Sequence, residues 1–436
     1  MMKKYLLIGV SIIHSFVEPM HVNHTMETNA GSAHQMIINS EGNHQEKAMH
    51  GMYGNYPMGR DATGTSWMPG STRMPGIHRM YHDWFVMIHG YAFAIYDHQG
   101  GPRGNRKFFS ENMLMFTAQK ETDRGIFAFR SMFDLEPGTI GPHGYPLLLQ
   151  TGETANGITP LIDRQHPHDL FMELALVYTL MISDKSSFFI YFGIPGEPAL
   201  GPPAFIHRFS AVFNPEAPIT HHWLDSTHIQ FGVATLGFVH DWLKIDGSIF
   251  TGREPDQHRW NFDRPRFDSY SIRLSANLTE DIAAQVSHAF LKSPEQLTPD
   301  VNTRRTTASL IYNKAWNNNN WQTTFAWGRN NNHPGRVLNG YMLESAVEIN
   351  DQHIIFGRAE YVAKDELFLP PSPFAGQVFK VGKIDAGYIF EFNPIPNTQW
   401  GLGFVASASF VPREIKPVYG GTPLSYMVFL RAELKE

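Results

Sequence analysis

From residue 84 onward, apolar and polar residues alternate along the sequence with a period of two. Runs of roughly ten residues show this alternation, as S-Y-S-I-R-L-S-A does at residues 269–276. Successive side chains of a β-strand point to opposite faces, so each run predicts a strand with one apolar and one polar face. The pattern recurs at residues 321–327, 343–349 and 400–409. The sequence therefore predicts an all-β protein.

The connections between these runs alternate between short and long. Seven are tight turns, such as residues 183–186, and eight are longer stretches, such as residues 136–169, 193–227 and 330–339. Short turns at one rim, long loops at the other and an even number of strands are typical of outer-membrane barrels. We therefore predict a closed antiparallel transmembrane β-barrel of about 16 strands over residues 84–436.

The composition indicates which face of the strands is inside. Only 17% of the residues are charged, and charges of both signs, such as Lys244, Asp246 and Glu344, occupy the polar face. A soluble sheet of this size needs helices or a second sheet over its apolar face, and the sequence after Trp84 shows no amphipathic helix. No run of 18 apolar residues occurs, which excludes transmembrane helices. We expect an apolar exterior in contact with membrane lipid, a polar lumen and a place in the outer membrane.

The first 83 residues have a different composition. Residues 1–22 combine Lys3 and Lys4 with an apolar stretch, as a secretory signal peptide does, without a defined cleavage site. Residues 23–83 are rich in methionine and histidine and poor in aliphatic residues, so we expect an extended or disordered segment. The alternative is a linker whose methionines wedge into the barrel mouth. The chain has no cysteine, which excludes disulfides and thiol chemistry.

Three of the long loops carry histidines and carboxylates at short spacing. They contain D-R-Q-H-P-H-D at residues 163–169, N-P-E-A-P-I-T-H-H-W-L-D at residues 214–225 and R-E-P-D-Q-H-R-W at residues 253–260. Imidazole suits Cu, Zn, Ni and Fe, and a neighbouring carboxylate orients the ring. The candidate metal ligands in these loops are His166, His168, His207, His221, His222, His258, Glu216 and Asp225. The alternative is that these side chains only brace one another within a plug.

We expect two histidine pairs to converge on one site. His166 and His168 precede one predicted strand, His221 and His222 precede another, and only one hairpin lies between. The groups expected around these imidazoles are Arg164, Asp169, Glu216 and Asp225. Because metal–nitrogen bonds are about 2 Å long, a separation of more than about 15 Å would exclude a shared ion.

The methionine- and histidine-rich segment indicates a softer metal. Thioether sulfur selects Cu(I), while imidazole accepts Cu(II) and Zn(II). Met49, His50 and Met52 stand together in M-H-G-M and resemble the clusters of copper-handling periplasmic proteins. We therefore expect copper as the bound metal, with zinc as the alternative.

Several long strings resemble a known family. Besides the loop motifs D-R-Q-H-P-H-D and N-P-E-A-P-I-T-H-H-W-L-D-S-T-H, they include P-G-E-P-A-L-G-P-P at residues 195–203 and Y-D-H-Q-G-G-P-R-G at residues 96–104. These strings are similar to those of a widespread bacterial family of outer-membrane β-barrels that has no established activity. Its members are often linked to copper-resistance genes. The resemblance implies the barrel fold and leaves the function open.

The function that we expect is a channel or receptor for copper or another divalent metal. The sequence has no G-x-S-x-G elbow, phosphate-binding loop or H-E-x-x-H helix. Whether the protein is an enzyme stays open. The alternatives are a metal-dependent hydrolase or oxidoreductase with its site in the lumen, and a structural barrel without transport. A net charge of -6 and the lack of a basic block argue against nucleic acid as a partner.

Overall fold

The computed structural model describes residues 50–436. In this part of the chain, sixteen antiparallel strands close into a barrel. Two predictions lie outside the described residues. They are the signal peptide at residues 1–22 and the part of the methionine- and histidine-rich segment at residues 23–49, which includes the candidate ligand Met49. No helix among residues 50–436 is long and apolar enough to cross a membrane.

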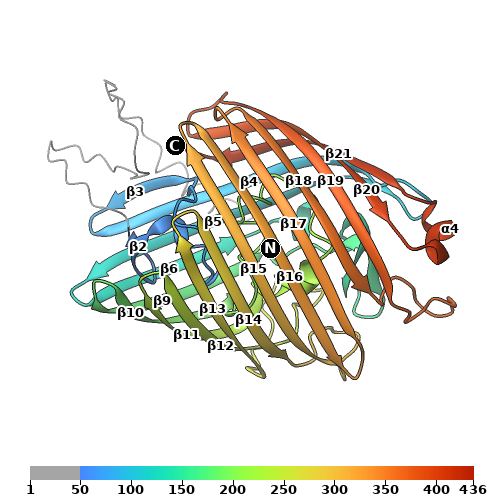
Figure 1. Ribbon diagram of the computed structural model, residues 1–436, viewed down its shortest axis with the longest axis horizontal. Coiled ribbons are helices and arrows are strands. Elements are labelled where there is room, and N and C mark those ends of the chain that lie inside the picture. The colour runs from blue at the N-terminus through green and yellow to red at the C-terminus, as the bar shows by residue number, and fades with distance from the viewer. Residues whose placement is uncertain (1–49) are drawn as a thin grey trace, which may run out of the picture. The chain divides into compact units, whose positions relative to one another are not determined.

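Neighbouring strands of the barrel lie side by side in the order of the sequence (Figure 1). They are β4 (Trp84–His98), β5 (Arg106–Thr122), β6 (Gly125–Phe133), β9 (Phe171–Ser183), β10 (Ser186–Gly196), β11 (Gln230–His240), β12 (Leu243–Phe250), β13 (Ser269–Thr279), β14 (Ile282–Leu291), β15 (Asn302–Trp316), β16 (Asn319–His333), β17 (Val337–Ile349), β18 (His353–Lys364), β19 (Phe379–Phe392), β20 (Thr398–Phe410) and β21 (Leu424–Leu434).

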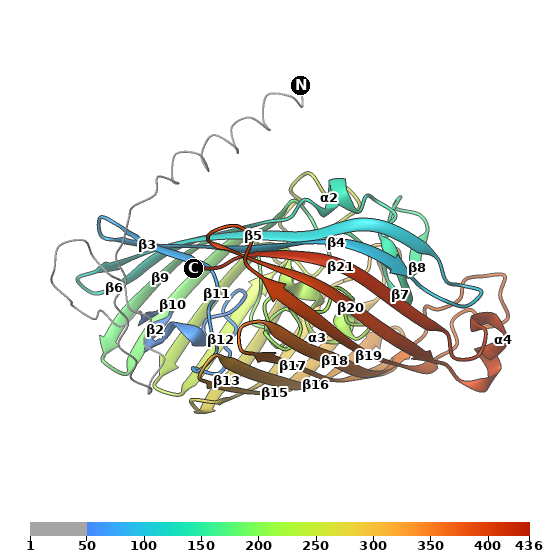
Figure 2. The ribbon, with the colours of Figure 1, turned by 90° about the horizontal axis from the view of Figure 1, so that it is seen from above.

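Pairing between the last and first long strands closes the barrel. Strand β21 pairs with β4 from Tyr426 opposite His98 to Glu433 opposite Tyr91. The short strand β3 (Ile77–Tyr81) pairs with the remaining start of β4. Two views place β3 at one end of the barrel and α4 (Lys416–Tyr419) at the other (Figures 1 and 2).

The connections follow the predicted alternation with one exception. The short turns lie at one rim and the long loops at the other, and the long loops contain α2 (Glu136–Thr139), β7 (Tyr145–Thr154), β8 (Pro160–Gln165), α3 (His221–Leu224), η3 (Ser226–His228), η4 (Arg413–Ile415) and α4. The predicted long loop at residues 330–339 is instead a turn of three residues, 334–336. The polar run Asn330–His333 belongs to β16, because its backbone pairs with β15.

The two faces of the wall have the predicted polarity. Large apolar side chains on the outside, such as Leu236, Ile272 and Leu402, are 53–68% exposed. Charged side chains that alternate with them, such as Lys244 and Glu344, are buried in the lumen. The strands thus present an apolar surface outward and a polar surface inward.

Residues 50–76 pack inside the short-turn rim, and we call them the N-terminal plug. They include β1 (His50–Gly51), β2 (Gly54–Pro57) and η2 (Met58–Arg60). The plug bonds to carbonyls of successive turns: Asn55 donates to Asp184, Arg60 to Asp241 and Ser71 to Glu280. The expectation of an extended or disordered segment does not hold for these residues. Methionines and aromatic residues provide the apolar surface that aliphatic residues usually supply, and both Tyr53 and Trp67 are buried.

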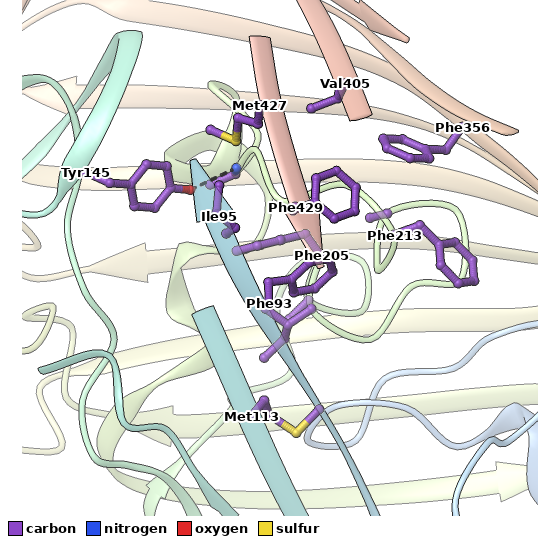
Figure 3. Close-up of a cluster of buried hydrophobic side chains, with 14 of the residues drawn as sticks. Phe93, Ile95, Met113, Tyr145, Phe205, Phe213, Phe356, Val405, Met427 and Phe429 are labelled. Carbon is purple, nitrogen blue, oxygen red and sulfur yellow. Dashed lines mark hydrogen bonds between the residues drawn. The ribbon is translucent and has the colours of Figure 1, made fainter. Parts of the chain in front are cut away.

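Two long loops fill the lumen from the opposite rim. They are residues 134–170, between β6 and β9, and residues 197–229, between β10 and β11. Their apolar side chains meet an apolar patch of the inner wall, where Phe205 and Phe213 lie near Phe93 and Phe429 (Figure 3). Tyr145 accepts a hydrogen bond from the backbone of Ala217, which joins the two loops. The lumen is therefore not polar throughout, because the inserted loops require apolar partners.

Candidate metal centre

The two inserted loops bring five buried histidines together. His166 and His168 follow β8, His221 and His222 lie in α3, and His228 ends η3. We call these five residues the histidine cluster. Each is at most 6% exposed. The ring centroids of His166 lie 6.4 Å from His168, 6.5 Å from His221 and 5.8 Å from His222. Those of His228 lie 5.2 Å from both His168 and His221. The predicted convergence of the two pairs is confirmed, while metal binding stays a prediction.

Asp225 fixes the orientation of two of these rings. Its Oδ1 lies 2.8 Å from Nδ1 of His221, and its backbone carbonyl lies 2.8 Å from Nδ1 of His228. Arg208 and the backbone N–H of Phe205 donate to the other carboxylate oxygen at 2.7 and 2.9 Å. A histidine held through Nδ1 presents Nε2 to a metal. In His228 this Nε2 is buried and has no hydrogen-bond partner.

His168 and His222 are held by carboxylates in a different way. Neither ring nitrogen of either residue makes a hydrogen bond, although all four nitrogens are buried. Nδ1 of His168 lies 3.1 Å from Glu136 and 3.3 Å from Asp134. Nδ1 of His222 lies 3.4 Å from Glu254. These distances place each ring beside negative charge without a well-directed hydrogen bond.

Three histidines of the cluster have a lowered pKa and two have a raised pKa. Burial lowers the pKa of His166, His221 and His228, so these imidazoles are neutral. Burial alone would also lower the pKa of His168 and His222. The carboxylate of Glu136 instead raises the pKa of His168, and the carboxylate of Glu254 raises that of His222 to about 10. Because a metal binds neutral imidazole, the first three residues are prepared for coordination, whereas His168 must lose a proton.

A small cavity lies at the centre of four of these rings. Its volume is about 10 Å³, and its lining includes His166, His168, His221 and His228 together with Glu153. This is roughly the volume that one water molecule or one metal ion occupies. Rings that bind one tetrahedral ion have centroids about 5 Å apart, given metal–nitrogen bonds of about 2.1 Å. The two centroid separations of 5.2 Å at His228 match this value. The ring nitrogens themselves are less close. In the described part of the chain, the sets of three possible ligand atoms within 4.8 Å of one another are Asp134, Glu136 and His168, and His222, Glu254 and Glu295.

Three predicted ligands lie away from the cluster. His207 contacts Met132 and His89 elsewhere in the lumen. His258 is exposed and lies beside Gln257, although Pro255 and Arg259 of the same loop line the cavity. Glu216 lies 2.9 Å from Lys383 of the barrel wall.

The remaining predicted groups are divided between the site and the rest of the lumen. Asp169 lines the cavity and binds Arg259, whereas Arg164 is half-buried and donates to the carbonyl of His143. His50 belongs to β1, and Met52 is buried in the N-terminal plug. The plug places these two residues at the opposite rim from the loop histidines.

The sequence interpretation missed His228 and the carboxylates that flank the cluster. It treated residues 193–227 as a long loop without helices. Two short helices, α3 and η3, instead flank Asp225, so that His221 four residues before it and His228 three residues after it both reach its oxygens. This spacing was present in the sequence. Glu136, Glu153 and Glu254 come from separate loop segments, and no local spacing relates them to the histidines.

The closed barrel, with its apolar exterior and charged lumen wall, defines a transmembrane β-barrel of the outer-membrane type.

No protein-family model and no curated protein matches the sequence. Among solved structures, OmpF of Salmonella typhi in complex with daunomycin matches with 9% identity and a TM-score of 0.47, over 82% of this chain and 100% of that chain. The anion-selective porin from Comamonas acidovorans matches with 8% identity and a TM-score of 0.46, over 80% and 100%. OpdK from Pseudomonas aeruginosa matches with 8% identity and a TM-score of 0.41, over 80% and 97%.

Proposed function

We propose that this outer-membrane barrel is a channel or receptor that handles copper or another divalent metal, and that the histidine cluster is its binding site. Its outer face then contacts membrane lipid. The resemblance of its loop motifs to a family linked to copper-resistance genes is consistent with this role. The proposal itself depends on the geometry of the lumen.

The observation that carries the proposal is the cavity among His166, His168, His221 and His228. Buried polar atoms in proteins are nearly always hydrogen-bonded, so the unpartnered Nε2 atoms of His168 and His228 beside this cavity call for another partner. A borderline divalent cation is the partner that imidazole favours. Asp225 then keeps two rings in the orientation that binding requires.

The size of the cavities favours binding over catalysis. The cavity in the cluster and its neighbour along His168 have volumes of about 10 and 20 Å³ in the described part of the chain. Such spaces accept an ion or a water molecule, whereas pockets for organic substrates are typically some hundreds of Å³. The N-terminal plug and the two inserted loops also occupy the lumen. We therefore favour a receptor or a gated channel over an open pore or a lumenal enzyme.

Metal binding by the purified, refolded full-length protein tests this proposal. We expect about one Zn(II) or Cu(II) ion per chain after desalting. The double variant His166→Ala/His228→Ala is expected to bind at least tenfold more weakly. His240→Ala is the matched control, because this exposed histidine bonds to Ser186 near a short turn. Equal stoichiometry and affinity in the double variant would contradict the proposed site.

Conductance in planar bilayers tests the closed lumen separately. The filled barrel is expected to show no steady large conductance. A steady open-pore current from the wild-type protein would contradict the receptor or gated-channel proposal, whatever the metal measurements show.

A further inference from the structure

A second group of metal-binding side chains lies on the inner wall, apart from the histidine cluster. His89 of β4, Met115 of β5 and Met132 of β6 stand in one row, because His89 pairs with Met115 and Met115 pairs with Met132 across the strands. His207, from the inserted loop 197–229, lies against this row. We call these four residues the thioether site.

The four side chains are in direct contact. Nε2 of His89 lies 3.1 Å from Sδ of Met115, and Nε2 of His207 lies 3.4 Å from Sδ of Met132. The two imidazole rings have centroids 5.0 Å apart and are nearly perpendicular. With metal–nitrogen bonds of about 2.1 Å and metal–sulfur bonds of about 2.3 Å, nitrogen and sulfur ligands of one tetrahedral ion lie about 3.6 Å apart. The two nitrogen–sulfur distances observed here are about 0.5 and 0.2 Å shorter than this value.

The surroundings of the thioether site are rich in sulfur. A cavity of about 80 Å³ adjoins His89, His207 and Met115. Seven of the nineteen methionines of the chain line this cavity, namely Met52, Met58, Met68, Met74, Met87, Met113 and Met115. Four of them belong to the N-terminal plug. The methionines that made the N-terminal sequence unusual are thus gathered at one place in the lumen.

The charges around this cavity do not select a cation by themselves. Asp61 and Glu433 line it together with Arg73 and Arg130, so opposite charges are balanced. Selectivity must then come from the softness of the ligands. Thioether sulfur with imidazole favours Cu(I), and Ag(I) as its analogue, over the harder divalent ions.

We propose that His89, His207, Met115 and Met132 form a binding site for a soft monovalent cation, Cu(I), and that the methionine-lined cavity is its approach. The loop that supplies His207 also supplies three members of the histidine cluster. The protein therefore carries two sites of different chemistry, one for a divalent ion and one for a monovalent ion. The second site does not depend on the first being correct.

Cu(I) binding by the refolded full-length protein tests this proposal. Competition with a chromogenic Cu(I) chelator under anaerobic reducing conditions gives the affinity, and Ag(I) serves as a probe without redox chemistry. X-ray absorption gives the ligand atoms. The wild-type protein is expected to show metal–sulfur as well as metal–nitrogen scattering. Absence of metal–sulfur scattering in the wild-type protein would overturn the proposal, and this result needs no variant.

The double variant Met115→Leu/Met132→Leu removes both thioethers and nearly conserves side-chain volume. It is expected to bind Cu(I) at least tenfold more weakly and to lose metal–sulfur scattering. Met427→Leu is the control, because this buried methionine of β21 lies outside the cavity. Unchanged Cu(I) affinity in the double variant would overturn the proposal. His166→Ala/His228→Ala should retain Cu(I), so failure of the divalent site and failure of the thioether site are distinguishable.

Discussion

Asp225→Asn separates the role of one carboxylate in orienting histidines from its role in stability. Asparagine has nearly the same shape as aspartate but only one acceptor oxygen. That oxygen is expected to remain toward Arg208 and the N–H of Phe205, because the amide NH₂ group in that place would face two donors. The NH₂ group then faces Nδ1 of His221, which must become an acceptor. The ring proton moves to Nε2, the atom that otherwise binds the metal.

The magnitude follows from the groups that are lost. Loss of a carboxylate that orients a metal-binding histidine typically lowers metal affinity 10- to 100-fold, or about 1.4–2.7 kcal/mol. The ion pair with Arg208 is also lost, although Arg208 keeps Glu344 at 2.6 Å. Loss of one hydrogen bond to a charged group costs about 1.5–3 kcal/mol in the free energy of unfolding. The variant should therefore fold and bind the divalent ion more weakly.

The assay is a Zn(II) competition titration of the refolded variant, with urea unfolding measured in parallel. Asp246→Asn is the matched control. Asp246 is a buried carboxylate that accepts from Arg273 at 2.9 Å and from Thr65 at 2.6 Å, with no contact to the histidine cluster. We expect similar losses of stability in both variants but weaker Zn(II) binding only in Asp225→Asn. Wild-type Zn(II) affinity in a folded Asp225→Asn protein, or equal weakening in both variants, would refute the reasoning.

Three further variants test the structure around the sites. Arg130→Met removes the ion-pair partner of the buried Glu173 and two hydrogen bonds to carbonyls of the N-terminal plug. Urea unfolding should therefore show a free energy of unfolding that is lower by about 3–5 kcal/mol. Gly152→Ala should cost about 1–3 kcal/mol in the same assay, because φ is +114° and the new Cβ would lie 2.4 Å from His222. Leu274→Arg, on the outer face at the middle of β13, should destabilise the membrane-inserted barrel by about 2–4 kcal/mol, whereas Ile158→Arg in an exposed loop should not. Wild-type unfolding curves for these three substitutions would contradict the respective arguments.

The barrel was predictable because its pattern is local. Apolar and polar residues alternate along most of each strand, and a one-residue shift in register would turn the charged side chains of a strand toward the membrane. The turn at residues 334–336 was missed because Asn330–His333 is polar on both faces, so the alternation that marks a strand is absent there. Strand identity in that stretch depends on backbone pairing with β15, which composition does not reveal.

The convergence of the histidine pairs was also predictable, because it depends on chain order. The two loops that carry them flank a single hairpin, β9–β10, so their histidines enter the lumen side by side. Which side chains complete the site was not predictable in the same way. Glu254 and Glu295 reach His222 from loops that follow later strands, and only the folding of those loops into the lumen brings them close.

The thioether site shows most clearly what sequence spacing misses. His89, Met115 and Met132 are separated by 26 and 17 residues, and each reads locally as one inward position of an ordinary strand. Their contact exists only because the pairing of β4, β5 and β6 aligns the three positions in one row. A shift of one residue in the register of β5 would turn Met115 outward and separate it from His89 and Met132. A barrel wall can therefore assemble a metal site from residues that form no motif, and such sites are found by following the register.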